Sequence, residues 1–340
     1  MTKLLIIIFT IISSISYGET INSQDTYFFK GLFYKKGIHK PFTGIVEGNS
    51  VGRLVEGKRE GPWEYFEEEK VVRRINYKNG LKHGLSQKFN LKGLYDGFKN
   101  WKNGKEHGKF EQYIRKKLYR KGTYKNGKLD GLFEEYDNGV ISQRFQFKDG
   151  LWNGDVFYFY DQDKVGSHFQ FKNGRKHGSW KEFHENGNIQ LFQTYVDGKQ
   201  VGLEERFYEN GNLEWKSFYV DGEQDGLLIE YLENGNVYRK TNYKKGWKHG
   251  LYESFYDNGQ LSTKGEYYEN YKYGNWFYYR LNGKLQMTEE YDKEEFEKRF
   301  IKMFNNEGKL KKSGMRYFNR DIGEWSYYED DELIKTTGKE

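Results

Sequence analysis

Glycine recurs in this chain at a fixed interval, and that interval constrains the fold more than any other feature of the sequence. Ten glycines are separated by steps of 23 or 24 residues, and a second glycine stands four residues before most of them. A period in this range is typical of repeat proteins, in which each unit folds as one small motif and packs on its neighbours. The repeat glycines are Gly61, Gly84, Gly108, Gly131, Gly154, Gly178, Gly202, Gly226, Gly250 and Gly274.

The residues between the repeat glycines alternate in the manner of a β-strand. Leu251, Glu253 and Phe255 share one parity, the residues between them share the other, and the run ends at Asn258-Gly259. Asn-Gly between alternating runs is a strong hairpin signal, because both turn residues must accept a positive φ. We therefore predict an all-β fold, an elongated single-layer antiparallel sheet of about twelve tandem β-hairpin repeats of 23 to 24 residues.

Aromatic residues support this register. The chain has 30 Tyr, 26 Phe and 8 Trp beside 40 Gly and only 2 Pro, a composition that favours strands and tight turns. Equivalent residues of adjacent hairpins should lie about 9.6 Å apart, and we expect stacked rings to replace a conventional core on one face. Column 1, five residues after the repeat glycine, is Phe66, Phe89, Tyr113, Tyr136, Phe159, Phe183, Phe207, Tyr231, Phe255, Tyr279 and Tyr328. Column 2, seven residues before it, is Tyr77, Trp101, Tyr124, Phe147, Phe171, Tyr195, Tyr219, Tyr243 and Tyr267.

The repeat unit resembles the MORN repeat, particularly its bacterial variant. The resemblance is carried by segments such as YKNGLKHGLSQKF (77–89) and YKKGWKHGLYESFYDNGQL (243–261), and it covers roughly residues 52 to 335. It implies a twisted single-layer sheet with two open faces. It also implies scaffolding, protein association or lipid-headgroup contact, and some bacterial members are labelled antitoxin-like. The resemblance assigns no active site.

The ends of the chain depart from the repeat. Lys3, an apolar run from Leu4 to Ile12 and small residues after it have the layout of a secretory signal peptide, predicted over residues 1–18 with cleavage after Ser16 or Gly18. The apolar run is too short to span a bilayer, which takes about 20 residues. The leader predicts an exported protein that resides in the periplasm, on the outer surface or outside the cell.

Three further segments follow the leader. We expect an N-terminal cap over 19–51, the regular array over 52–283, and degenerate C-terminal repeats with a cap over 284–340. Within 289–304 a charged residue near Lys298 takes the place of the repeat glycine. A degenerate hairpin is preferred there over a short helix, because Tyr291 and Phe304 still fit the aromatic columns.

The Lys-His-Gly triplet that ends at repeat glycines Gly84, Gly178 and Gly250, with Glu106-His107-Gly108 as a near copy, is the feature most suggestive of chemistry. His83 and His107 occupy the same slot in neighbouring hairpins, so they should lie about 9.6 Å apart, too far to share one zinc ion. The same slot holds Asp130, Asn153 and Val201 in other units, which indicates a turn position. We find no phosphate loop, zinc-protease or serine-hydrolase motif and no Cys. The sequence therefore predicts no enzyme, no cofactor and no metal.

Large side chains two residues after the repeat glycine remain as candidates for binding. They have the parity opposite to column 1, so they should lie on the other face, and exposed aromatic stripes commonly mark binding surfaces. A second structural ladder is the alternative reading. The candidates, column 3, are Trp63, Phe110, Phe133, Trp180, Tyr252, Trp276 and Trp325.

The predicted function is a non-enzymatic interaction scaffold at the bacterial envelope or cell surface, with a protein partner or a second copy of the chain. The alternatives are a binder of lipid headgroups or polysaccharide at the envelope, and an antitoxin-like neutralising protein. Lys and Arg number 56 against 50 Asp and Glu, and both signs are mixed along the chain. That balance gives no support for a nucleic-acid partner.

Overall fold

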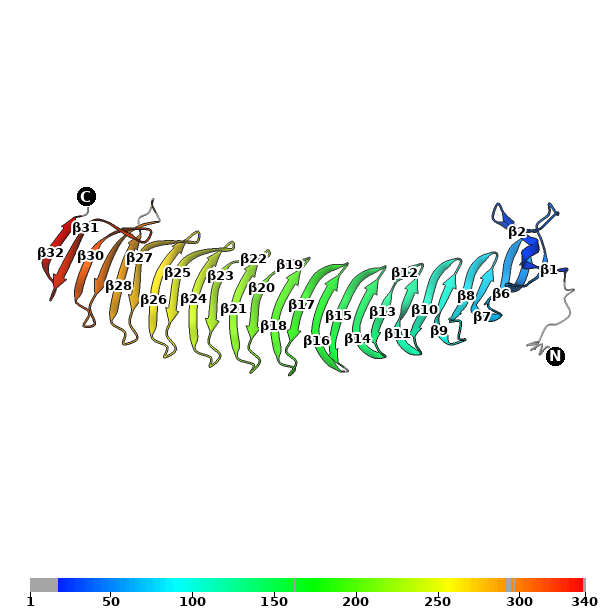
Figure 1. Cartoon of the computed structure of the whole chain (residues 1–340), viewed down its shortest axis with the longest axis horizontal. Coiled ribbons are helices and arrows are strands. Elements are labelled where there is room, and N and C mark those ends of the chain that lie inside the picture. The colour runs from blue at the N-terminus through cyan, green and yellow to red at the C-terminus, as the bar shows by residue number, and fades with distance from the viewer. Residues whose placement is uncertain (1–17, 162, 292–294, 296, 339–340) are drawn as a thin grey trace. The chain divides into compact units, whose positions relative to one another are not determined.

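A computed structural model describes residues 18–161, 163–291, 295 and 297–338. The chain divides into two compact units, Met1–Leu151 and Trp152–Glu340, and each is a run of β-strands (Figure 1). Within the described ranges the only helical turn is the 3-10 segment η1 (Ser23–Asp25), and no helix there is long and apolar enough to cross a membrane. The all-β prediction and the tandem antiparallel hairpins are confirmed.

Unit 1 begins with an irregular segment and continues as regular hairpins. β1 (Thr20–Asn22) pairs in parallel with β4 (Gly44–Glu47), while β2 (Thr26–Phe29) and β3 (Leu32–Lys35) form a separate two-stranded hairpin. The later strands pair antiparallel in chain order. They are β5 (Ser50–Val55), β6 (Lys58–Glu67), β7 (Lys70–Lys78), β8 (Leu81–Phe89), β9 (Tyr95–Lys102), β10 (Lys105–Ile114), β11 (Lys117–Lys125), β12 (Lys128–Leu129), β13 (Gly131–Asp137) and β14 (Val140–Lys148).

Unit 2 repeats the same hairpin from its first strand to its last. Its strands also pair antiparallel in chain order, and short strands occur where a connection briefly interrupts the ladder. They are β15 (Leu151–Asp161), β16 (Lys164–Lys172), β17 (Arg175–Phe183), β18 (Ile189–Val196), β19 (Lys199–Gln200), β20 (Gly202–Phe207), β21 (Leu213–Val220), β22 (Glu223–Gln224), β23 (Gly226–Tyr231), β24 (Val237–Lys244), β25 (Trp247–Phe255), β26 (Leu261–Tyr268), β27 (Tyr271–Tyr279), β28 (Leu285–Tyr291), β29 (Lys298–Phe304), β30 (Leu310–Tyr317), β31 (Arg320–Glu329) and β32 (Glu332–Gly338).

The segment that lacks its repeat glycine is a hairpin. β28 and β29 pair antiparallel, with Tyr291 opposite Arg299. The preference for a degenerate hairpin over a helix at 289–304 is therefore confirmed in its strands. Residues 292–294 and 296 lie outside the described part of the chain, as does the predicted leader through residue 17.

Pairing register decides which aromatic columns share a face. Gly61 pairs directly with Tyr77, and Trp63 pairs with Ile75. Residues that face each other across antiparallel strands project to the same side of the sheet. Columns 2 and 3 therefore lie on one face, which we call the ladder face. The opposite face carries Leu85, Leu132, Leu203, Leu227 and Leu251, one residue after the repeat glycine, and we call it the leucine face.

Column 1 belongs to the leucine face, and this corrects our expectation that the rings of columns 1 and 2 stack together on one face. A register shift separates Tyr65 from Phe66 in β6, and the same shift recurs in later hairpins. The Tyr136 hydroxyl in column 1 donates to Glu134, whose carboxylate also accepts from Arg144 at 2.8 Å. The rings of column 1 are half-buried, while the more deeply buried rings belong to the ladder face.

Tryptophan rings lie flat on glycines at the centre of the ladder face. A methyl group built on Gly52, Gly265 or Gly314 would overlap the indole ring of the tryptophan eleven residues later in sequence. These tryptophans are Trp63, Trp276 and Trp325, all 4% exposed or less. A glycine without a side chain lets each ring cover the backbone of the adjacent strand, so a single sheet buries large apolar groups without a second layer.

Candidate functional site

The seven column 3 residues are not an exposed stripe. Trp63, Phe110, Phe133, Trp276 and Trp325 are each 8% exposed or less, and they form much of the buried core. The expectation that these side chains lie on an open face is wrong for these five. The alternative reading, a second structural ladder, describes them. Their burial follows from the register, which places them beside the rings of column 2.

Trp180 and Tyr252 are half-buried in the same ladder. Trp180 stacks on Phe169 with ring centroids 3.5 Å apart, and the Lys176 ammonium lies 3.7 Å from the Trp180 ring centroid. Tyr252 contacts Tyr267 and Trp276 at centroid distances of 5.6 and 5.3 Å. Both residues use their rings for packing within the repeat array.

The residue before the repeat glycine braces the next connection between hairpins. The side chains of His107 and His177 accept from the backbone N–H of Asn126 and Asp197 at 3.3 and 3.4 Å, and Asp225 accepts from Lys245 at 3.3 Å. Each accepting side chain satisfies the N–H of a turn residue held at positive φ. The Lys-His-Gly triplets themselves lie within strands β8, β17 and β25, each opposite a register shift in the preceding strand, so the prediction of a turn position is corrected to a bulged strand position that braces a neighbouring turn. Across the described ranges, no group of three or more His, Asp or Glu side chains could hold a metal ion.

The most deeply buried ionisable cluster in the described ranges has a structural role on the ladder face. Glu289 in β28 accepts hydrogen bonds from Tyr278, Tyr291 and Arg299 at 2.5, 2.9 and 2.8 Å, and the Lys272 ammonium lies 3.5 Å away. Burial raises the pKa of the Glu289 carboxyl, but these hydrogen bonds and the Lys272 charge outweigh it and hold the pKa below its usual value. Its oxygens are occupied by neighbours, so this carboxylate fits a structural role.

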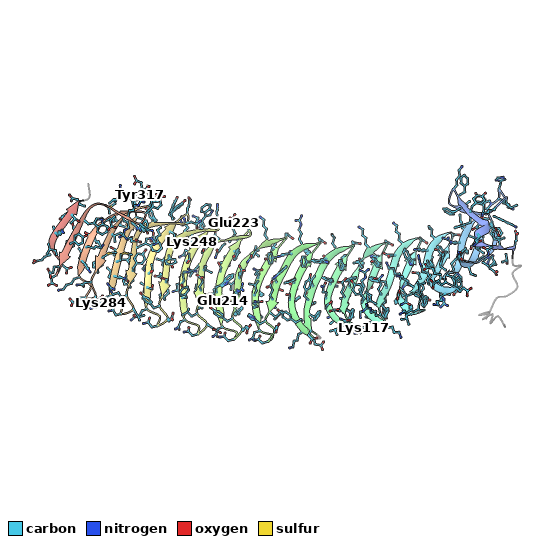
Figure 2. All side chains as sticks on the ribbon, in the orientation of Figure 1. Lys117, Glu214, Glu223, Lys248, Lys284 and Tyr317 are labelled. Carbon is cyan, nitrogen blue, oxygen red and sulfur yellow. The ribbon has the colours of Figure 1, made fainter. Side chains whose placement is uncertain are left out.

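An exposed apolar row lies on the leucine face of unit 2. Leu203 pairs directly with Phe218, and β21, which carries Phe218, lies between β20 and the strand of Leu227. These three side chains are 40 to 46% exposed. Val220 and Trp247 stand exposed at the connection edge of the same unit, the edge marked by Glu223 and Lys248 in Figure 2. We call Leu203, Phe218, Val220, Leu227 and Trp247 the apolar row.

Cross-strand charges surround the leucines along this face. Lys264 and Glu253 pair at 3.2 Å, and Lys216 lies directly opposite Glu205 across β20 and β21. Partly exposed pairs of this kind contribute roughly 0 to 1 kcal/mol to stability. They leave the face charged in both signs around an apolar centre, which is the usual composition of a protein-binding surface.

Two sequence signals could have identified the correct faces. Glycine eleven residues before a column 3 ring marks the ring that lies flat on the sheet, as in Gly122 before Phe133 and Gly265 before Trp276. Leucine directly after the repeat glycine recurs in five units and marks the exposed column. Neither signal entered the sequence-based choice of binding residues, which used parity alone.

Comparison with known proteins identifies the repeat. A family model described as a MORN repeat variant matches residues 176–197, 200–221, 224–245 and 248–270. A search of curated proteins found no match. The solved structure titled "Crystal Structure of TcdB2-TccC3" aligns with 84% of this chain and 20% of that chain, at 11% identity and a TM-score of 0.17, which is too low to support a structural argument.

The four matched segments cover the strands from β17 to β26, and the strands of unit 1 carry the same glycine and aromatic spacing. MORN repeats are in general motifs that bind proteins or membranes, and they are not typically catalytic. Four tandem repeats within residues 176–270 of this chain match the MORN repeat variant.

Proposed function

We propose that this chain is a non-enzymatic binding protein that holds a protein partner on the leucine face of unit 2. The observation that carries the proposal is the apolar row, in which Leu203, Phe218 and Leu227 stand side by side and 40 to 46% exposed. Exposed apolar groups that adjoin one another on a folded protein commonly mark interaction sites. The mixed charges around the row favour a protein partner.

The row has enough apolar surface to anchor a complex. Complete burial of a large aliphatic or aromatic side chain contributes about 1.5 to 3 kcal/mol, and each member of the row is already about half covered. Five such members would supply several kcal/mol at the centre of an interface, with aromatic anchors at Phe218 and Trp247. Strand pairing holds the backbone of the row in place, so a partner meets a preorganised surface.

We place this activity outside the cytoplasm, at the bacterial envelope or cell surface. The support is the leader, with Lys3 before the apolar run from Leu4 to Ile12. Scaffolding is the finer role we assign, because a repeat array presents an extended face to more than one segment of a partner. The partner is a different protein or a second copy of this chain.

In-cell photo-crosslinking tests the proposal. A photo-reactive phenylalanine analogue at Leu227 should give a discrete adduct in the cells that produce the protein, and Phe218→Glu in the same chain should abolish that adduct. Leu281→Glu, at an exposed turn residue away from the row, is the matched control and should leave the adduct intact. An adduct of twice the chain mass would identify self-association. An adduct that persists in Phe218→Glu would contradict binding through the row.

The β2–β3 hairpin favours a second candidate function, contact with a membrane surface. Phe28 and Phe29 are 63 and 54% exposed beside the turn residue Lys30, whose ammonium lies 5.4 Å from the Phe29 ring centroid. Exposed aromatic rings beside lysine suit the interface of an anionic bilayer. Sedimentation with phosphatidylglycerol vesicles should retain the wild-type chain and lose the Phe28→Ala/Phe29→Ala variant. Equal sedimentation of the two would remove this candidate.

A further inference from the structure

The ladder face of unit 1 is hollow at Ser86. This serine occupies the column 3 position between Trp63 and Phe110, both of which are 2% exposed. Its hydroxyl accepts from the Trp101 indole N–H at 2.7 Å and donates to the Lys99 carbonyl at 3.1 Å. A hydroxymethyl group in place of an aromatic ring leaves a hollow of about 390 Å³. That volume lies within the range of small-molecule sites, roughly 300 to 1,000 Å³.

Four cationic side chains line the hollow, and two of them are compensated. The Lys99 ammonium lies 2.5 Å from the Glu106 carboxylate, and Lys88 lies 4.0 Å from Asp96. Arg73 and Lys82 complete the set. Within the described ranges, neither Arg73 nor Lys82 has an acidic side chain at ion-pair distance. Glu111, whose carboxylate accepts a hydrogen bond from Tyr113 at 2.7 Å, also lines the hollow, and the four cationic side chains outnumber the two acidic ones, Asp96 and Glu111. The hollow therefore holds an excess of positive charge.

Lys82 is held against the wall of the hollow. Its ammonium lies 4.2 Å from the centroid of the Trp101 ring. Burial lowers the pKa of the Lys82 amine, and the charges of Arg73 and Lys99 lower the pKa further, against the opposing effect of Glu106. Two cations that repel each other in a partly desolvated hollow are stabilised by an anion placed between them.

We propose that the hollow binds an oxyanion, the phosphate or sulfate group of a small soluble molecule, between Arg73 and Lys82. A guanidinium group offers paired N–H donors that match two oxygens of such a group, and the ammonium supplies a point charge. The Ser86 hydroxyl and the Gln112 side chain also line the hollow and can meet the remaining polar atoms of the ligand. This site lies in unit 1, and it is independent of the apolar row in unit 2.

Titration calorimetry with inorganic phosphate tests the proposal on the full chain at low ionic strength. We expect one site per chain, weakened by added sodium chloride because the charges are partly exposed. Ser86→Phe restores a ring at the hollow, keeps the net charge, and should remove the binding. Arg73→Gln removes one charge-assisted contact and should weaken binding by at least about tenfold. Lys102→Gln, which removes an equal charge from the exposed end of β9 outside the hollow, should bind as the wild type does.

Circular dichroism of each variant shows whether it folds like the wild type. If Ser86→Phe misfolds, the conservative Arg73→Gln change, compared with Lys102→Gln, tests the proposal. Absence of phosphate binding to the wild type would overturn the proposal, and so would equal binding to Arg73→Gln and Lys102→Gln. A second titration uses phosphatidylglycerol vesicles, with phosphatidylcholine vesicles as the control. Binding to anionic vesicles without binding to free phosphate would contradict a soluble ligand in the hollow.

Discussion

Replacing Trp276 by alanine should remove more stability than the same change at the exposed Trp247 in the same unit. The Trp276 ring is 1% exposed, lies on Gly265, and contacts Tyr267 and Tyr252 at centroid distances of 5.0 and 5.3 Å. Its indole N–H donates to the Glu266 carbonyl at 3.1 Å. Loss of the ring therefore exposes two tyrosines and the backbone beneath it.

The loss of stability expected for Trp276→Ala follows from the surface area that the ring buries and from its contacts. A buried tryptophan removes about 150 to 250 Å² from water, which at about 25 cal/mol per Å² gives about 4 to 6 kcal/mol as an upper bound. Relaxation around the cavity reduces this value, so we expect a loss of about 3 to 5 kcal/mol for Trp276→Ala. Trp247→Ala, at a side chain 52% exposed, should cost no more than about 1 kcal/mol.

Native-state hydrogen exchange in the strands on either side of Trp276, together with guanidinium titration of the full chain, measures the two variants. Exchange is needed because a repeat array can open locally and depart from two-state unfolding. Amides of β26 to β28 should lose most of their protection in Trp276→Ala and keep it in Trp247→Ala. Equal losses in the two variants, or a larger loss in Trp247→Ala, would refute the assignment of the ladder face as the stabilising face.

Three further predictions follow from particular residues. Gly265→Ala places a methyl group in the Trp276 ring and should destabilise the chain by at least about 2 kcal/mol by thermal melting, and a wild-type melt would contradict that contact. The folded-state pKa of Glu289 is depressed, so its contribution to stability is present above the unfolded pKa near 4.5 and is lost as the pH falls through the folded pKa. Denaturation at pH 3 to 7 should show this loss in the wild type and a flatter profile in Glu289→Gln. N-terminal sequencing of the exported protein should begin at Tyr17 or Glu19, and a full-length chain retained in the cytoplasm would contradict export.

The hairpin repeat could be predicted from sequence because its signals are local. Asn258-Gly259 fixes a turn, the alternation after Gly250 fixes a strand, and the 23 to 24 residue step fixes the repetition. The variety of residues in the His177 slot indicated a structural position, but it did not show that His177 lies within β17 and braces the turn at Asp197 from there. Each of these inferences needs only a few neighbouring residues.

The choice of the buried face depended on pairing between strands, which parity along one strand does not determine. Parity correctly separated Trp63 from Phe66, but it could not show that Tyr77 pairs with Gly61 and so joins Trp63. The bulge after Tyr65 changes the register of the return strand by one residue, and no turn motif marks it. The hollow at Ser86 likewise depends on Arg73, Lys82 and Lys99 meeting from three strands.

Hydroxyl-radical footprinting of the protein, purified and in the cells that produce it, tests the central claim most directly. In the purified chain, the exposed Phe218, Leu227 and Trp247 should be oxidised readily, whereas Trp63 and Trp276 should be protected. In cells, oxidation of Phe218 and Leu227 should fall while Leu281, at an exposed turn, stays reactive. Equal oxidation of Phe218 in the two samples would contradict a partner on the leucine face of unit 2.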